Sequence, residues 1–252
     1  MSRDIPALVR LLWRHEIPVG RARGRPARIT VDDLVASGIA IADADGIAAL
    51  TMRAVASRLG TGPMSLYAHV PDKTTLLALM ADQVLSDMTH AVDDGAAGWR
   101  ARLERLAAEN RALHLEHPWL SSSGADAMPI GPGAIAKYER ELRALEPLGL
   151  PPLDTDACLT LLVEFARASA AAELAATDAD ADWWADAAPV LAGLAGPERF
   201  PLATRIGAIA GEQHGAPRDA AHAWRFGLDR ILDGIASLAG DAHGARAERR
   251  TD

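Results

Sequence analysis

Apolar residues along the chain recur at spacings of three and four, and the period-two alternation typical of strands is nearly absent. Ala and Leu dominate these stretches, and Gly and Pro clusters separate them. The pattern therefore predicts an all-α fold. The expected helices are a short amphipathic one in "IPALVRLLWRH" (5–15) and longer ones at 30–44, 51–59, 63–70, 73–92, 98–116, 133–147, 154–177, 182–194, 201–213 and 218–239.

Three polar segments interrupt or follow these helices. The Gly/Pro-rich "SSSGADAMPIGPG" (121–133) and the acidic "TDADAD" (177–182) are expected to be loops. The final "GDAHGARAERRTD" (240–252) is expected to be a frayed tail. The sequence contains no internal repeat.

The stretch "TMRAVASRLGTGPMSLYAHVPDK" (51–73) has the punctuation of two short helices. Thr51 suits the N-cap of the first, and Gly60 suits a left-handed residue just after its end. Pro63 is compatible with the first turn of the second helix, and Pro71 disfavours helix in the residue before it. Two short helices joined by a tight glycine-containing turn form a helix-turn-helix, the motif that places its second helix in a DNA major groove.

The two helices of this motif are expected to pack through one face and to expose another. The buried side is predicted to contain Val55, Ala56, Leu59, Leu66 and Val70, and the exposed side of the second helix Met64, Ser65, Tyr67 and Ala68. The N-terminal residues of that second helix would then meet base edges.

Length and composition narrow the class of protein. With 252 residues, 49% of them apolar, the chain is long enough to bury a core in one large domain or two ordinary ones. Its one cysteine, Cys158, excludes an intrachain disulfide, and no Cys/His cluster has zinc-site spacing. No apolar run reaches the ~20 residues of a membrane span, and no signal peptide begins the chain. We therefore expect a cytoplasmic protein without membrane, metal or cofactor.

Charge is distributed unevenly along the chain. The net charge is −8, yet the first 75 residues carry ten basic and seven acidic side chains, a balance of +3, which leaves −11 for the rest. The excess of positive charge lies in "RARGRPAR" (21–28), which contains Arg21, Arg23, Arg25 and Arg28. Such a segment is either a solvated leader or a basic segment that binds phosphate.

The sequence over residues 30–90 resembles the tetracycline-repressor (TetR/AcrR) family of bacterial transcription regulators. The resemblance lies in Leu-Thr-x-Arg at 50–53, Leu-Gly at 59–60, Leu-Tyr-x-His-Val at 66–70 and the Lys and Leu-Leu that open the next helix. The stretch "GPGAIAKYERELRALEPLGLPP" (131–152) is similar to the tetracycline-repressor-type C-terminal domain. The resemblance implies a three-helix DNA-binding domain at 30–75, a helical ligand-binding and dimerisation domain at 76–240, an N-terminal extension at 1–29 and a flexible tail at 241–252.

The resemblance also implies which residues contact DNA. Arg53 matches a family contact position, and a guanidinium suits a guanine edge or a phosphate; a surface ion pair with Asp32 or Asp33 is the alternative. Pro63, Met64 and Ser65 match the base-facing start of the recognition helix, where Pro and Met offer only shape and apolar contact. The other matched positions are Tyr67, His69, Lys73 and Thr51.

Each of these other positions has a second interpretation or a second role. Tyr67 and His69 are expected at the phosphate backbone or the bases, or else as packed residues. The ammonium of Lys73 and the amides at the start of its helix are expected to hold one phosphate together, and Thr51 is expected to cap its helix and also to contact phosphate. Next to this motif, the arginine segment is expected to enter a minor groove or to lie on the DNA backbone.

A single recognition helix reads few base pairs, so we expect a homodimer on a palindromic operator in double-stranded DNA. In the family, two helices of each copy form a four-helix bundle across the dyad. The matching segments are 154–177, which is rich in Ala and Ser, and 218–239, where Trp224, Leu228, Ile231, Leu232, Ile235 and Leu238 are spaced by three and four. Packing within one chain is the alternative explanation for both.

The family's C-terminal domain encloses a small-molecule pocket, and the ligand moves the helix that starts near Lys73. The candidate ligand-binding residues are Thr89, Leu106, Asn110, Leu113, His114, Trp119, Met128 and Phe165. Asn110 and His114 are favoured because an inward-facing polar group needs a partner. Where tetracycline-binding members place His, Asn and Phe, this chain has Thr89, Leu106 and Asn110, a departure that argues against tetracycline as the inducer.

Two other functions remain open from the sequence. The first is an all-helical enzyme that uses "HLEHPW" (114–119), where His114 and His117 flank Glu116. The spacing is not that of an H-E-x-x-H metalloprotease, and the chain has no phosphate loop, dinucleotide-binding fingerprint or G-x-S-x-G elbow. The second is a constitutive DNA-binding protein without a small-molecule ligand. The favoured prediction is a ligand-responsive repressor.

Overall fold

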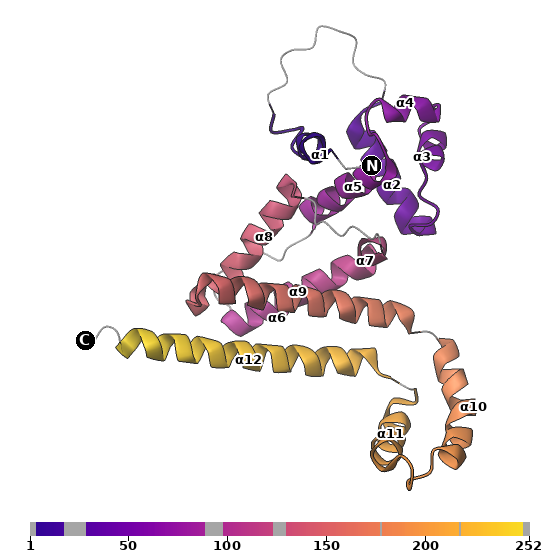
Figure 1. Cartoon of the computed structure of the whole chain (residues 1–252), viewed down its shortest axis with the longest axis vertical. Helices are drawn as coiled ribbons and strands as arrows, with labels where there is room; N and C mark the ends of the chain where they lie inside the picture. The colour runs from indigo at the N-terminus through magenta and orange to yellow at the C-terminus, as the bar shows by residue number, and fades with distance from the viewer. Residues whose placement is uncertain are drawn as a thin grey trace.

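The computed structural model describes residues 4–17, 29–88, 98–122, 130–176, 178–216 and 218–248. All regular elements within these ranges are helical, which confirms the all-α expectation (Figure 1). The helices are α1 (Ile5–Leu12), α2 (Val31–Asp45), α3 (Met52–Arg58), α4 (Pro63–Tyr67), α5 (Lys73–Asp87), α6 (Trp99–Glu116), α7 (Trp119–Ser122), α8 (Pro132–Leu145), a 3-10 turn η1 (Glu146–Leu148), α9 (Pro152–Ala175), α10 (Asp178–Leu194), α11 (Pro201–His214) and α12 (Ala220–Glu248).

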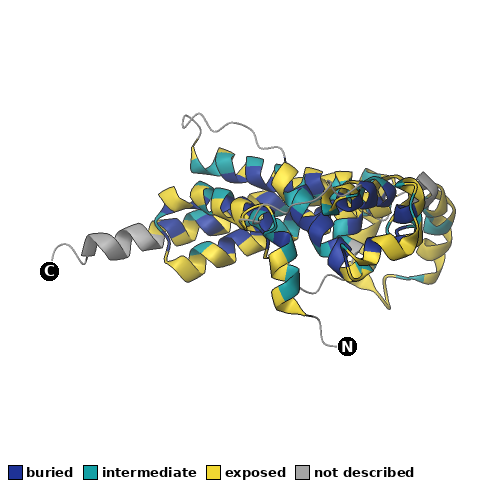
Figure 2. Ribbon diagram, turned by 90° about the horizontal axis from the view of Figure 1, so that it is seen from above, coloured by how far each residue is buried: buried dark blue, intermediate teal, exposed yellow. Residues whose placement is uncertain are grey.

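The N-terminal helices α2 to α5 share one core, and α1 packs on its edge. Leu34, Leu50, Leu66, Leu76 and Met80 are fully buried there. Figure 2 shows the buried residues in dark blue on the inner sides of the helices. Residues along the whole of α5 join this core. The N-terminal unit is therefore α1 to α5, with α5 leading towards the rest of the chain.

A second core lies between α6, α8, α9 and α12. The long helices α9 and α12 run side by side and both pack on α6 (Figure 1). Leu103, Leu145, Leu162 and Leu232 are fully buried between these helices. Of the apolar positions in α12, Leu228, Leu232 and Ile235 therefore belong to packing within one chain.

Helices α10 and α11 form an arm that projects from the second core (Figure 1). We use "arm" for residues 178–214. Gly211 is the one buried residue among those of the arm whose burial the structure describes, and Gly211 lies against the Trp184 ring. The arm thus has almost no core of its own.

The structure differs from the sequence expectation at three places. Residues 178–182 start α10 instead of forming a loop, because aspartates are favoured in the first turn of a helix, where the helix dipole is positive. Residues 240–248 continue α12 instead of fraying, in keeping with the high helix propensity of Ala, Arg and Glu. The short helix α7 was not expected. Within the described residues, no helix is both long enough and apolar enough to cross a bilayer.

Candidate DNA-binding face and ligand site

The turn between α3 and α4 is built by backbone hydrogen bonds. The Gly60 amide donates to the Ser57 carbonyl oxygen at 3.1 Å, and the Thr61 amide donates to that of Ala56 at 3.0 Å. This is the Schellman pattern, and it requires the left-handed conformation that Gly60 adopts with φ of 63°. Pro63 then occupies the first turn of α4. The predicted helix-turn-helix punctuation is confirmed, except that α4 ends at Tyr67 and not near residue 70.

The two faces of α4 separate apolar packing from exposure as predicted. Leu66 and Val70 are fully buried against α3 and its neighbours. Met64 is 80% exposed and Tyr67 is 45% exposed. Pro63, Ser65 and Ala68 are exposed as well. A short helix held by its inner face therefore presents a convex outer face to solvent.

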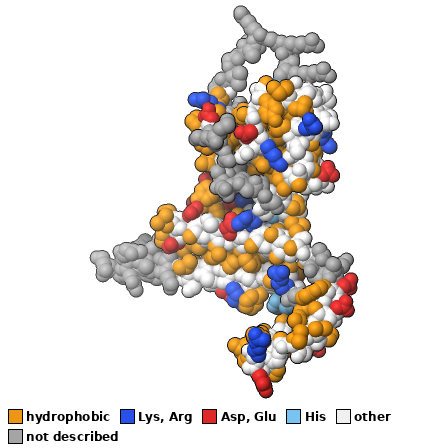
Figure 3. All heavy atoms as spheres, turned by 45° about the vertical axis from the view of Figure 1, so that its right-hand side comes forward, with side chains coloured by type: hydrophobic (Ala, Val, Ile, Leu, Met, Phe, Trp, Pro, Cys, Tyr) orange, Lys and Arg blue, Asp and Glu red, His pale blue; other side chains and the backbone are white. Residues whose placement is uncertain are grey.

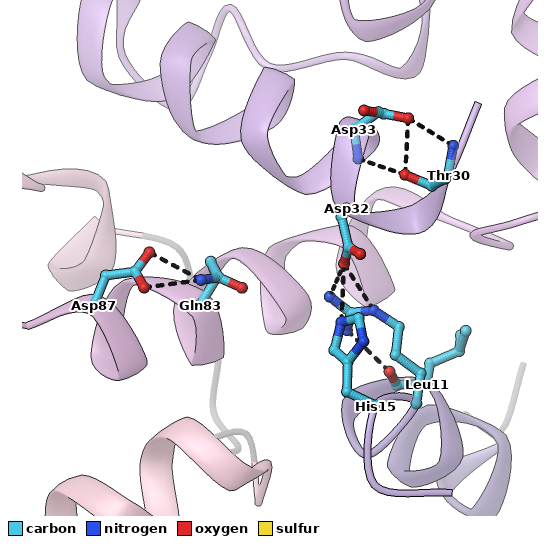
Figure 4. Close-up of polar contacts among 8 residues, drawn as sticks. Leu11, His15, Thr30, Asp32, Asp33, Gln83 and Asp87 are labelled. Carbon is cyan, nitrogen blue, oxygen red and sulfur yellow. Dashed lines mark hydrogen bonds and ion pairs between the residues drawn. The ribbon is translucent and has the colours of Figure 1, made fainter. Parts of the chain in front are cut away.

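Arg53 is exposed on α3, and the two acids proposed as its alternative partners have other contacts. Asp32 pairs with Arg14, and its carboxylate oxygen lies 3.2 Å from His15 Nε2 (Figure 4). Partial burial acts to raise the pKa of Asp32, but the contact with Arg14 lowers it below the usual range. Asp33 accepts hydrogen bonds from the Thr30 amide and hydroxyl, completing the capping box of α2.

Thr51 and Lys73, the two residues predicted to contact phosphate at helix N-termini, differ in their surroundings. The Thr51 hydroxyl accepts a hydrogen bond from the Ala54 amide at 3.0 Å, so it caps α3 as predicted. The Lys73 ammonium donates to the Ile47 carbonyl oxygen at 3.2 Å, and Asp72 caps α5 by accepting from the Thr75 amide at 2.7 Å. This carboxylate adds negative charge at the point where Lys73 was expected to hold a phosphate. His69, two residues after the end of α4, is half-buried.

Six of the predicted site residues lie outside the described residues. Four belong to the predicted DNA contacts and two to the predicted ligand site: Arg21, Arg23, Arg25, Arg28, Thr89 and Met128. Their roles stay predictions.

A buried polar group lies inside the C-terminal domain, between α6 and α8. The Lys137 ammonium donates to both carboxylate oxygens of Glu141, at 2.6 and 2.7 Å. Asn110 donates its amide N–H to Glu141 at 2.6 Å and to the Leu106 carbonyl oxygen at 3.0 Å. All three side chains are almost fully buried, and Asn110 Oδ1 is buried with no hydrogen-bond partner. An unpaired acceptor in this setting is suited to a hydrogen-bond donor from a ligand.

His114 lies one turn further along α6 than Asn110. Its Nδ1 lies 3.1 Å from the Ser121 hydroxyl. Burial first, and then the nearby charges of Arg167 and Lys137, lower the pKa of His114 to about 4. The ring is therefore neutral at pH 7, where one nitrogen donates and the other accepts a hydrogen bond.

The other predicted pocket residues do not lie together. Leu106 packs in the second core, whereas Leu113 and Trp119 pack in the N-terminal core. Phe165 stacks on Trp224, with ring centroids 5.4 Å apart and planes at 8°. Lys137 and Glu141 were not among the predicted site residues, although their four-residue spacing on one helix is a signal for an ion pair.

His114 and His117, the pair considered for an enzyme, contact different residues. His117 Nδ1 lies 2.8 Å from an oxygen of Asp43, a residue of α2, while His114 contacts Ser121. The Trp119 indole N–H donates to the same Asp43 oxygen at 2.7 Å. Across the described residues, no three His, Cys, Asp or Glu side chains converge as metal ligands do.

Two sequence profiles match this architecture. Residues 34–80 match the bacterial regulatory proteins of the tetR family, and residues 92–239 match the tetracyclin repressor-like C-terminal domain. The chain belongs to the TetR family. Its relatives in this family are DNA-binding transcriptional regulators and not enzymes, which removes the enzyme alternative.

Relatives of known name agree with this assignment. The chain is 34% identical to the HTH-type transcriptional repressor DrrR1 of Streptomyces coeruleorubidus, over 98% of this chain and 91% of that one. It is also similar to apo ActR of Streptomyces coelicolor, with a TM-score of 0.72 and 29% identity over 86% of this chain and all of ActR. The structure of ActR in complex with actinorhodin also matches, with a TM-score of 0.72 and 27% identity over 86% of this chain and 99% of ActR.

Proposed function

We propose that this TetR-family regulator is a repressor that binds a palindromic operator as a homodimer and releases it when a small molecule enters the C-terminal domain. The observation that supports this proposal most strongly is the outer face of α4, where Met64, Ser65 and Tyr67 are exposed on a helix anchored by Leu66. Its proposed place of action is the cytoplasm.

Direct readout by this face would combine apolar and polar contacts. Met64 and Pro63 offer contact to thymine methyl groups, while the Ser65 and Tyr67 hydroxyls offer hydrogen bonds to bases or phosphates. Arg53 on α3 adds a cation that neither Asp32 nor Asp33 neutralises. Because α4 is only five residues long, we expect few base contacts per copy and a need for two half-sites.

The proposal of a dimer rests on apolar side chains that the single chain leaves exposed. Leu161 and Leu174 on α9 are about half exposed, as are Phe226 and Leu238 on α12. The arm adds Leu194, Leu202, Ile206 and Ile209, each more than half exposed. Figure 3 shows hydrophobic side chains on the surface of the arm. A groove of about 560 Å³ between α10 and α11, lined by Trp184, Leu191 and Phe200, is apolar as well. A contiguous apolar surface of this kind marks an interface with another protein surface.

The proposed ligand site is the polar group of Asn110, Lys137 and Glu141 with the neutral ring of His114 nearby. The free acceptor of Asn110 and the neutral imidazole favour a ligand that presents hydroxyl or N–H groups to an otherwise apolar domain. The complex of the similar protein ActR with actinorhodin supports a small-molecule inducer of this chain.

A gel shift of the DNA upstream of the chain's own gene tests the proposal, repeated with actinorhodin and with tetracycline plus Mg²⁺ as the first probes. We expect a shift that actinorhodin reverses and tetracycline leaves in place. Absence of any shift on upstream DNA or on a random duplex pool would overturn the DNA-binding role. A shift that resists a wide panel of metabolites would favour constitutive binding instead. Light scattering tests the dimer, and a monomer at micromolar concentration would contradict it.

A further inference from the structure

Helix α5 carries a buried acid at the point where it meets the C-terminal domain. Asp82 is 7% exposed. One of its carboxylate oxygens accepts from the Ala134 amide at 2.8 Å, and the other accepts from the Gly133 amide at 3.3 Å. These amides belong to the first turn of α8, where backbone N–H groups have no partner within their own helix. A side chain of the N-terminal unit (α1 to α5) therefore caps a helix of the C-terminal domain.

The contact between α5 and α8 leaves no room for a larger residue. Gly131 is the N-cap of α8, and a Cβ placed on it would overlap the Asp82 carboxylate. A Cβ on Gly133 would overlap the Asp82 backbone oxygen. Two glycines in three positions thus allow the helices to approach closely enough for the carboxylate to reach both amides.

Opposing electrostatic effects act on the Asp82 carboxyl group. Burial raises the pKa of Asp82 above its usual range, and the hydrogen bonds from Ala134 and Gly133 and the charge of Arg14 offset only part of this rise. The positive end of the α8 dipole favours the ionised form. The N-terminal extension holds the same segment, because the Trp13 indole N–H donates to the Ile130 carbonyl oxygen at 2.9 Å. Residues 130–134 therefore accept a hydrogen bond from Trp13 at the end of α1 and donate hydrogen bonds to Asp82 of α5.

We propose that Asp82 is a positioning residue through which α8 sets the orientation of α5, and with it that of the recognition helix α4. Helix α8 carries Lys137 and Glu141, one and two turns beyond Gly133. At the proposed ligand site Glu141 accepts hydrogen bonds from Asn110 and from Lys137. A ligand that displaces this polar group would move α8, and the Asp82 contact would pass the movement to α5. This inference rests on the proposed function, since it concerns how the ligand and DNA sites communicate.

The alternative is a helix cap that serves stability alone. A polar contact elsewhere between the two units separates the two roles. Asp43 of α2 contacts His117 and Trp119 at a different place, so the units stay joined when the Asp82 contact is lost. Loss of a simple cap would lower the free energy of unfolding and leave operator affinity unchanged. Loss of a positioning contact would let α5 adopt several orientations, and operator affinity would fall with the fraction that is competent to bind.

The test uses two pairs of variants of the full chain. Asp82→Asn is paired with Asp87→Asn, because Asp87 lies on the same helix, is exposed and contacts Gln83 of that helix (Figure 4). Gly131→Ala is paired with Gly98→Ala, because Gly98 is the N-cap of α6 and a Cβ there meets nothing within 4 Å. Affinity is measured by fluorescence anisotropy on a duplex selected from a random pool by the wild-type chain.

Asp82→Asn and Gly131→Ala are each expected to weaken operator binding about tenfold, and both controls are expected to remain within about twofold of wild type. In an Asp82→Ala background, which makes room for the new methyl group, Gly131→Ala should have little further effect, because both changes act on one contact. Operator affinities equal to those of the controls, with only the unfolding midpoint lowered, would reduce Asp82 to a cap and overturn the inference.

Hydrogen exchange on the free chain supplies a readout that needs no DNA. Asp82→Asn should speed exchange in residues 131–135 and also in α3 to α5, whereas Asp87→Asn should do neither. Faster exchange confined to residues 131–135 would contradict the positioning role. A wild-type chain that selects no duplex would overturn the proposed function, and the exchange pattern would then decide the Asp82 contact independently.

Discussion

The helix-turn-helix and the arm are both pairs of helices joined by short connections, but the first buries its apolar residues and the second leaves them exposed. The helix-turn-helix segment 51–70 buries Val55, Leu66 and Val70 completely and exposes a small outer face. Helices α10 and α11 leave Leu194, Leu202 and Ile206 more than half exposed. The first pair is supported by α2 and α5, whereas the second projects from the molecule (Figure 1).

The difference indicates what each surface meets. Helices α3 and α4 already bury their apolar residues against α2 and α5, so they need no partner in order to fold. Their exposed outer face is available for a polar partner such as DNA. A pair of helices without a core gains stability only when another apolar surface covers it. On the proposed function, α4 therefore presents a surface for recognition and the arm a surface for assembly, and variants in each region test this difference.

The largest effect is expected inside the helix-turn-helix. Leu66→Ala should lower the free energy of unfolding by about 2–5 kcal/mol, because Leu66 is completely buried and its removal leaves a cavity. Leu202→Ala on the arm, where the side chain is 62% exposed, should change it by less than about 0.5 kcal/mol in the monomer. Urea unfolding at a concentration that keeps the chain monomeric measures both. Equal losses would remove the contrast between the two regions.

The arm should matter most for assembly. Ile206→Glu places a charge on the exposed apolar face and should raise the dimer dissociation constant at least a hundredfold, or about 2.7 kcal/mol. Arg205→Glu changes the charge of the adjacent exposed residue and serves as the matched control. Sedimentation velocity over a dilution series measures both constants. The assignment of the arm to the interface fails if the two variants dimerise alike.

The ligand domain should show a pH dependence that comes from His114. The pKa of the His114 ring is about 4 in the folded chain, against 6.5 for an unperturbed histidine, which is the value expected in the unfolded chain. Between these two pH values the unfolded chain therefore binds more protons than the folded chain. Stability should therefore fall as the pH drops from about 6.5 to about 4. The loss should be about 2 kcal/mol after allowance for solvent screening at this half-buried site. His114→Gln should flatten the pH profile in this window, as followed by thermal unfolding, and an unchanged slope would count against a buried neutral ring.

A smaller effect is expected on the outer face of the helix-turn-helix. Arg53→Ala should weaken operator binding about tenfold through the loss of one charged contact, with no change in the unfolding midpoint. Arg143→Ala is the control, because Arg143 is also exposed, lies on α8 and pairs with Glu139. Anisotropy titrations compare the two. If both weaken binding to the same small extent, Arg53 contributes only to the general charge of the chain.

Local rules predicted the helix-turn-helix well. The Thr51 cap, the left-handed Gly60, the start at Pro63 and the buried Leu66 all depend on residues within a few positions of one another. The caps of longer helices were equally readable, as the Thr30 and Asp33 capping box shows. Backbone hydrogen-bonding rules of this kind act within one turn of helix, so a sequence displays them directly.

Contacts between distant segments were not predictable in the same way. Asp82 precedes its partner Ala134 by 52 residues, and Asp43 lies 76 residues before Trp119, so no local pattern connects them. The burial of Lys137 and Glu141 was hidden too, because an ion pair at this spacing is usually a feature of an exposed helix face. The candidate ligand site therefore needed the packing of α6 on α8 before its polar group could be recognised.

Oxidative footprinting of Met64 tests the central claim most directly. Met64 is 80% exposed on the outer face of α4, so hydroxyl radicals should convert it readily to the sulfoxide in the free chain. Saturating operator duplex should suppress oxidation of Met64 by at least fivefold and leave oxidation of Leu202 on the arm unchanged. Equal oxidation of Met64 with and without bound DNA would show that this face does not meet the duplex and would contradict the account.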